Sequence, residues 1–236
     1  MNRTTSTTIS AAAGMRPTAA GMRATAAPAF DAGRVLRNTY ALLAMTLLFS
    51  AGVAAASVAW RLPAPGLLLT LAGYFGLLFA IHRLRNSALA LPAVFALTGF
   101  MGYTLGPLLS HLLAIPGGSH VVGLAFGATA VTFLALSAFV LVTRRDFGFL
   151  GGFLFAGMIV ALVAALAAAF FELATLAIVV SAGVAFLSAG LILYETSRII
   201  HGGETNYVLA TVSLYVSIFN LFVSLLHLLG LGGADE

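Results

Sequence analysis

The stretch LILYETSRIIHGGETNYVLATVSLYVSIFNLFVSL, which spans residues 191–225, decides the fold of this chain. It contains two apolar runs that are joined by the short polar loop HGGETN at residues 201–206. The first run carries one acid near its end and the second carries four polar residues, and these five are Glu195, Ser213, Ser217, Asn220 and Ser224. A polar group inside an apolar run costs free energy unless it has a partner, so these positions are candidates for function.

The composition of the whole chain indicates a membrane environment. Of its 236 residues, 61% are hydrophobic and 8% are charged, and the mean hydropathy is +1.08. A soluble domain carries about 25% charged residues. Too few polar side chains remain to cover a surface in water, so we predict an all-α integral membrane protein. Cysteine is absent, which excludes disulfides and thiolate metal sites.

Seven apolar segments follow one another from residue 39 onward. A spanning helix needs about 20 such residues, and we predict helices at 39–60, 64–82, 88–113, 120–142, 148–170, 174–197 and 207–230. The breaks between them are short and hold arginine, proline, glycine or acidic residues. The prediction is a seven-transmembrane helix bundle formed by residues 34–236.

The arginines predict how the bundle is oriented. With the N-terminus in the cytosol, ten of the eleven arginines fall in cytosolic segments and only Arg61 falls outside. Cytosolic loops are enriched in arginine and lysine, so this orientation is favoured. The C-terminus is then outside, in the periplasm of a Gram-negative host. The net charge of +4 does not indicate nucleic-acid binding, because the arginines are scattered at segment ends.

Residues 1–33 differ in composition from the rest of the chain. They are mostly Thr, Ala, Gly and Arg, and they contain the near-repeat GMRPTAA and GMRATAA at 14–27. Such a segment cannot bury enough apolar area to offset the entropy of ordering it, so we expect a disordered cytosolic tail. Its acid-poor composition with Arg, Ser and Thr also resembles an organellar transit peptide.

The four polar residues of the last segment share one face. Their spacing of four, three and four residues places them on a single stripe of a helix. The stripe should therefore face protein or water, and we expect the seventh helix to be central and surrounded by the other six. Two interpretations remain open, hydrogen bonding between helices and a path for ions or protons.

Glu195 has a cationic neighbour, Arg198, three residues further along the same predicted helix. An acid and a base at this spacing form an ion pair naturally. One interpretation is a structural pair at the membrane surface. The other is a titratable gate, because removal from water and a nearby cation act in opposite directions on the charge of a carboxylate.

Small residues recur at the spacing at which helices pack closely. Gly102 and Gly106 form one G-x-x-x-G pair, and Gly123 and Gly127 form another. Close backbone approach drives helix association in lipid, so we expect both pairs to pack inside the bundle. Pro107 should free a backbone carbonyl and kink its helix. No nucleophile–base set, paired catalytic carboxylates, metal motif or phosphate loop is present, so neither an enzyme nor a cofactor is expected.

Several of these segments resemble the Bax inhibitor family, the transmembrane BAX inhibitor motif proteins. The similar stretches within the membrane segments are GYTLGP at 102–107, ILYETS at 192–197 and SLYVSIFNLFVS at 213–224. Four stretches resemble one bacterial branch of the family in particular: VLRNTY at 35–40, PAPGLLLTLAG at 63–73, TRRDFGFLGG at 143–152 and IIHGGETNYVLATVSLYVS at 199–217. The resemblance extends from residue 35 to the end of the chain.

This resemblance implies a regulatory function. Members of that bacterial branch are inner-membrane partners, substrates and inhibitors of the ATP-dependent membrane protease FtsH, which associates with HflK and HflC. Their cytosolic N-terminal tail is where the protease is thought to begin pulling. The chain is thus expected to bind and modulate FtsH, to be degraded by it, and to use residues 1–33 as the starting segment.

The resemblance also implies an alternative, a pH-sensitive cation or calcium leak channel. Other bacterial members pair an acid on helix six with an aspartate on helix seven, and an arginine near the end of helix two latches them. Glu195 matches the first acid, Ser217 stands at the second, and Arg83 or Arg85 is the candidate latch. Calcium prefers six to eight oxygens including carboxylates, so a single acid favours a weaker cation or proton path.

Overall fold

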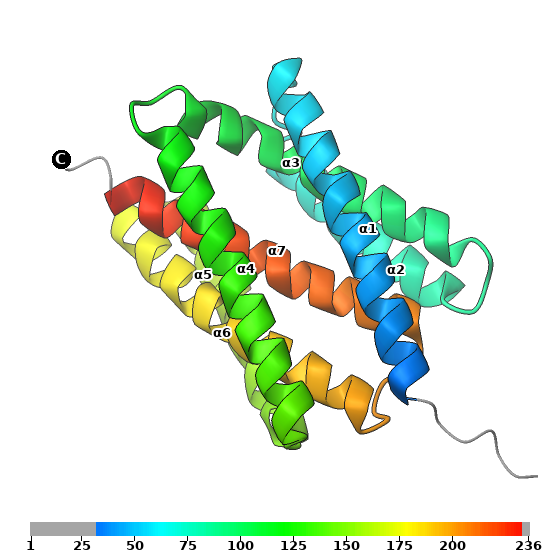
Figure 1. The fold of residues 1–236 in the computed structure, drawn as a ribbon. Helices are drawn as coiled ribbons and strands as arrows, with labels where there is room; N and C mark the ends of the chain where they lie inside the picture. The colour runs from blue at the N-terminus through cyan, green and yellow to red at the C-terminus, as the bar shows by residue number, and fades with distance from the viewer. Residues whose placement is uncertain (1–31, 233–236) are drawn as a thin grey trace, which may run out of the picture. The chain divides into compact units, whose positions relative to one another are not determined.

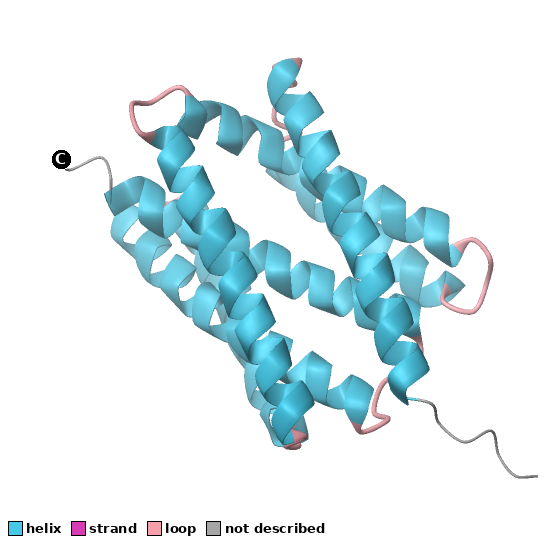
Figure 2. Ribbon diagram, in the orientation of Figure 1, coloured by secondary structure: helices cyan, strands magenta, loops and turns pink. Residues whose placement is uncertain are grey.

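The regular structure of the described residues is entirely helical. A computed structural model of the chain describes residues 32–232, and no strand occurs among them (Figures 1 and 2). The elements are α1 (Ala32–Ala59), α2 (Leu67–Leu84), α3 (Ala90–Leu113), α4 (Gly118–Thr143), the 3-10 helix η1 (Gly148–Leu150), α5 (Gly151–Phe170), α6 (Ala174–Ile200) and α7 (Tyr207–Gly232). The seven long helices are each long and apolar enough to cross a membrane, so this part of the fold prediction is confirmed.

The helix boundaries agree with the predicted segments to within three residues, except at the start of α1. Helix α1 begins at Ala32, seven residues before the expected position. Val35 and Leu36 pack against the main hydrophobic core, and this contact continues the helix past the two arginines that flank them. Residues 1–31 of the predicted tail lie outside the described residues.

Helix α7 is the most buried of the seven. In its most apolar stretch 56% of the residues are buried inside the protein, against 33% or less for each of the others. It packs against α1, α3, α4 and α6, and Figure 1 shows it crossing behind α4 and α1. The expectation that six helices surround it is wrong, because α2 packs mainly on α3 and α5 on α6. In lipid an apolar helix face needs no protein cover, so both remain at the periphery.

The contact between α1 and α3 depends on two glycines. A Cβ atom at Gly102 would collide with the backbone oxygen of Ser50, and one at Gly106 would collide with the side chain of Ser57. The absence of these side chains lets the two backbones approach closely. The predicted packing role of this G-x-x-x-G pair is therefore confirmed.

The proline in α3 is accommodated by the same contact. Pro107 has no N–H, so the carbonyl of Tyr103, four residues earlier, loses its helical donor. Ser57 of α1 donates a hydrogen bond from Oγ to that carbonyl at 3.3 Å. A hydroxyl of the neighbouring helix thus compensates the bond that the proline removes, and α3 continues to Leu113.

The second G-x-x-x-G pair behaves differently. A Cβ atom at Gly123 or Gly127 would meet nothing within 4 Å, and both residues are exposed on α4. The prediction that this pair packs inside the bundle is wrong. Glycine is common in membrane helices, and the spacing alone does not show which face of a helix meets a neighbour.

We predict that Gly102→Ala destabilises the protein. The added methyl group must displace α1 or α3, at a cost of about 1–3 kcal/mol, and this is measurable as a lower thermal transition of the protein in detergent. Gly127→Ala is the matched control, because alanine favours a helix and meets open space there. Equal stability of the two variants would contradict close packing of α1 and α3.

Candidate functional site at the corner between α6 and α7

The α6–α7 corner, which we define as residues 195–206, begins with a glycine-dependent helix end. Gly202 adopts the left-handed conformation with φ of 77°, and the N–H of Gly203 donates to the carbonyl of Arg198 at 2.8 Å. This is the Schellman arrangement, in which a glycine ends the helix and the next N–H satisfies a free carbonyl. The two glycines therefore serve turn formation.

Asn206 begins the next helix. Its Oδ1 accepts hydrogen bonds from the backbone N–H groups of Val208 at 2.9 Å and Leu209 at 3.3 Å. These N–H groups belong to the first turn of α7 and have no partner within the helix, so Asn206 is its N-cap. The cap sets where the helix starts, and with it the position of the polar stripe.

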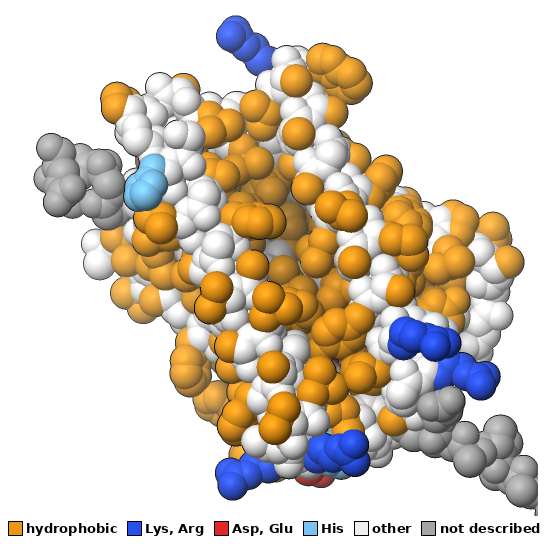
Figure 3. Space-filling view, viewed as in Figure 1, with side chains coloured by type: hydrophobic (Ala, Val, Ile, Leu, Met, Phe, Trp, Pro, Cys, Tyr) orange, Lys and Arg blue, Asp and Glu red, His pale blue; other side chains and the backbone are white. Residues whose placement is uncertain are grey.

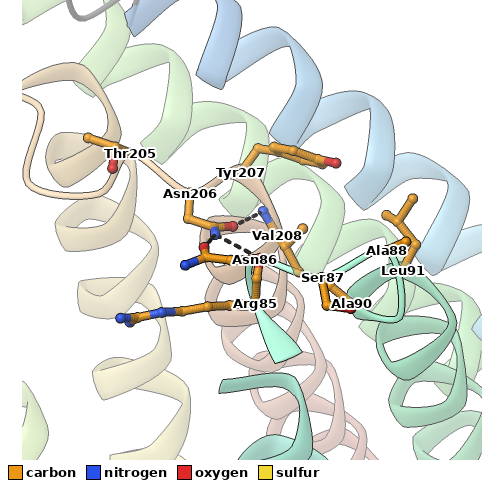
Figure 4. A pocket seen from close by; sticks show the side chains of 10 residues that line it. All are labelled: Arg85, Asn86, Ser87, Ala88, Ala90, Leu91, Thr205, Asn206, Tyr207 and Val208. Carbon is orange, nitrogen blue, oxygen red and sulfur yellow. Dashed lines mark hydrogen bonds between the residues drawn. The ribbon is translucent and has the colours of Figure 1, made fainter. Parts of the chain in front are cut away.

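The same side chain also binds the loop between α2 and α3. Its Nδ2 donates to the backbone carbonyl of Arg85 at 3.0 Å and contacts Oδ1 of Asn86 at 3.4 Å, as the dashed lines in Figure 4 show. The two loops border a pocket of about 500 Å³ whose lining includes Thr205 and Tyr207. One amide thus joins two loops that lie about 120 residues apart in sequence.

An arginine between two carboxylates forms the centre of the corner. The guanidinium of Arg198 lies 3.4 Å from Oε2 of Glu195 and 3.6 Å from Oε2 of Glu204, and it donates to the carbonyl of Gly203 at 3.1 Å. Glu195 is only 7% exposed. A buried carboxylate needs a partner of opposite charge, and Arg198 supplies it from the same helix. The predicted pairing at three-residue spacing is present in the structure.

A second set of contacts joins the corner to the loop between α4 and η1. Ser197 accepts a hydrogen bond at Oγ from the backbone N–H of Phe147 at 2.9 Å. The ring of His201 places Nε2 at 3.1 Å from the carbonyl of Arg144 and Nδ1 at 2.9 Å from the carbonyl of Ser197. Carbonyl oxygens only accept, so both nitrogens donate at once when the ring is protonated.

The polar stripe of α7 lies within the protein. Ser217 and Ser224 are buried, and Ser213 and Asn220 are partly buried. Ser217 donates from Oγ to the carbonyl of Ser213 at 2.9 Å, which is a bond along its own helix. The stripe is therefore sheltered, while the bonds of Glu195 run to Arg198 at the end of α6.

The candidate latch residues are placed differently from the acid. The side chains of Arg83 and Arg85 are both exposed at the end of α2. Arg85 joins the corner through its backbone carbonyl, which accepts from Asn206. The charge partner of Glu195 in the structure is Arg198. Among residues 32–232, no group of three or more His, Asp or Glu side chains is close enough to hold a metal ion.

Three residues of the corner were not predicted to organise the loops, namely Ser197, His201 and Asn206. An asparagine directly before an apolar run is a known helix-start signal and could have identified the cap. The contacts of all three with loops at 85–86 and 144–147 depend on tertiary structure, so the sequence pattern gives no sign of them.

Comparison with known proteins identifies the family. The family model described as "Inhibitor of apoptosis-promoting Bax1" matches residues 32–234, which is most of the chain. The chain therefore belongs to the Bax inhibitor family, as its membrane segments and the HGGETN corner predict.

Individual relatives cover nearly the same region. The chain is 54% identical over 202 residues to an uncharacterized protein of Pseudomonas aeruginosa, covering 86% of this chain and 91% of the relative. It is 51% identical over 202 residues to the "Modulator of FtsH protease YccA" of Escherichia coli, covering 86% of this chain and 92% of the relative. An uncharacterized membrane protein of Vibrio cholerae is 43% identical, with 85% and 91% covered. The name of the E. coli relative describes a modulator of a protease and not an enzyme.

We predict that Asn206→Ala and Asn206→Asp separate the two functions of this side chain. Alanine removes the cap and the bond to Arg85, with a cost of about 1 kcal/mol from the cap. Aspartate keeps the capping oxygen and loses only the donor. Thermal unfolding should therefore shift for alanine more than for aspartate, while amide hydrogen exchange at the α2–α3 loop rises in both. Unchanged exchange in both variants would contradict the link between the loops.

Proposed function

We propose that this chain is an inner-membrane protein that binds and modulates the FtsH protease, inhibiting it and being degraded by it. The observation that carries the proposal is the 51% identity with the E. coli modulator over 92% of that protein's length. A second relative that is also 51% identical is named an inner membrane protein. HflK and HflC, which accompany FtsH, belong to the proposed assembly.

We further propose that the seven helices span the membrane, with α7 central among α1, α3, α4 and α6, the N-terminus in the cytosol and the C-terminus in the periplasm. The hydrogen bonds of the corner support this orientation, because they gather the arginine-bearing loops at one end of the bundle. These loops carry Arg85, Arg144 and Arg145, and Arg83 and Arg198 lie beside them at the ends of α2 and α6. Figure 3 shows cationic side chains at that end and apolar side chains over the face between the ends. This distribution matches the enrichment of arginine on the cytosolic side.

The cytosolic end is the proposed surface for the protease. The α2–α3, α4–α5 and α6–α7 loops are held to one another by Asn206, Ser197 and His201, so the partner would meet a defined surface. The proposed orientation makes residues 1–33 cytosolic. Their composition, poor in large apolar side chains, suits a segment from which an ATP-dependent protease begins to pull.

Affinity capture and turnover test this proposal in native bacterial membranes. We expect FtsH, HflK and HflC to be captured with the full chain, and we expect deletion of residues 2–31 to lengthen its half-life several-fold. A variant in which residues 2–31 become a Gly/Ser segment of equal length is the control, and it should be degraded normally. Absence of FtsH from the captured material contradicts the modulator, and unchanged turnover contradicts initiation at this segment.

A pH-sensitive cation or calcium leak is the second candidate function. The observation in its favour is that buried polar groups without protein partners occur in the helices around α7. Within the described residues these are the hydroxyls of Thr39, Tyr40, Ser137, Ser188 and Thr196. Buried polar groups are normally hydrogen-bonded, so such hydroxyls suit a hydrated path. The path would lead along the α7 stripe to Glu195 and Arg198, with Arg83 or Arg85 as the latch.

The leak is tested in liposomes that hold purified protein and a calcium-sensitive dye. We expect a flux that depends on pH and is lost in Glu195→Gln, because the amide cannot change its charge. Glu204→Gln is the matched control, since this second carboxylate of Arg198 lies outside the helices. A flux that is absent at every pH, or that is equal in the protein and Glu195→Gln, removes this candidate.

A further inference from the structure

An apolar groove lies between α1 and α4, away from the corner. It has a volume of about 690 Å³, and α7 forms its floor, with the end of α3 closing one side. Figure 3 shows this face hollowed between the two helices, with hydrophobic side chains in the depression. Its walls are lined by Leu48, Ala51, Ala55, Phe126 and Leu134, and its floor includes Phe222.

The polar groups in the groove already have partners. The hydroxyl of Tyr215 lies 2.6 Å from Oγ of Ser50 and donates to the carbonyl of Thr98 at 3.3 Å. Thr129 donates to the carbonyl of Ala125 at 2.7 Å. A stable water molecule needs two to four polar partners, and these groups are occupied. The groove therefore suits an apolar occupant.

The length of the groove matches a lipid chain better than a transmembrane helix. Along α1 its lining extends from Leu47 to Ala59, a length of about 18 Å at 1.5 Å per residue. The bilayer core is about 30 Å thick, so this length corresponds to one leaflet. The groove therefore has the length of a single lipid chain and is shorter than a helix that crosses the whole bilayer.

The groove ends beside a cation. Ala59, Leu113 and Val122 line it near the ends of α1 and α3 and the start of α4. Trp60 and Arg61 come directly after the end of α1, and both side chains are exposed. Tryptophan is enriched where the bilayer meets water, and the planar guanidinium of arginine binds phosphate through two parallel hydrogen bonds.

From this arrangement we propose that the groove is a phospholipid site. One acyl chain lies between α1 and α4 over the floor formed by α7, and the phosphate of the headgroup is bound by Arg61. The exposed side chains at the rim, including Leu48 at 76% and Leu134 at 63%, open the groove to the surrounding lipid. The proposal does not depend on the protease function, because it rests on the groove alone.

Native mass spectrometry of the full chain, purified from membranes in mild detergent, tests the site. We expect one retained phospholipid per protein. Filling the groove by Ala51→Phe or Ala55→Phe should reduce this retained lipid at least fivefold, and Arg61→Gln should reduce it on dilution into detergent. Ala156→Phe is the matched control, because Ala156 is exposed on α5, away from the groove. Equal retention in all variants, or no retained lipid in the unaltered chain, overturns the proposal.

Crosslinking in the unaltered chain provides a second measurement that requires no variant to fold. A phospholipid with a photoreactive acyl chain is incorporated into the membrane, and the labelled peptides are mapped. We expect label on residues 47–59 and 122–134 to exceed label on the exposed faces of α2 and α5 several-fold. Even labelling of all exposed faces indicates ordinary surrounding lipid and overturns the site. Capture of a second copy or another protein in the groove overturns it as well.

Discussion

A hydrocarbon environment offers no hydrogen bonds, and the structure depends on this constraint. A backbone or side-chain polar group at membrane depth costs free energy when it has no partner. The chain satisfies much of this requirement through serine, threonine and tyrosine hydroxyls. Ser57 satisfies the carbonyl that Pro107 leaves free, and Tyr215 connects Ser50 of α1 with Thr98 of α3. Ser50 and Ser57 of α1 therefore lie where α3 packs closely and also take part in these hydrogen bonds.

At the end of the bundle the constraint is met by the α6–α7 corner. Ser197, His201 and Asn206 bind backbone groups of two other loops, and Arg198 balances two carboxylates. The loops that carry Arg85, Arg144 and Arg145 are held together in this way. The surface proposed to be cytosolic and the buried acid are consequently parts of one connected arrangement, which links the proposed protease surface with the candidate gate.

The corner at one end of the bundle and the groove on its side differ in chemical character. The corner presents charged loops to the aqueous phase, whereas the groove between α1 and α4 opens sideways and holds only satisfied polar groups. The same α7 supports both, since its start is capped by Asn206 and its middle forms the floor of the groove. A change in the packing of α7 would affect both regions.

The apolar segments and the polar breaks between them can be read from the order of residues, so the sequence by itself determined the helical class and the seven apolar spans. The three-residue spacing on one helix also determined the pairing of Glu195 with Arg198. It also determined the turn at Gly202, because local conformation sets that bond. Tertiary structure alone decided that Gly102 packs against α1 while Gly127 meets open space. It also decided that α2 packs mainly on α3, and α5 on α6, and not on α7. It also placed Asn206 against Arg85. These outcomes depend on which helix faces meet, and a lipid-facing surface is as apolar as a packed one, so hydrophobic pattern does not distinguish them.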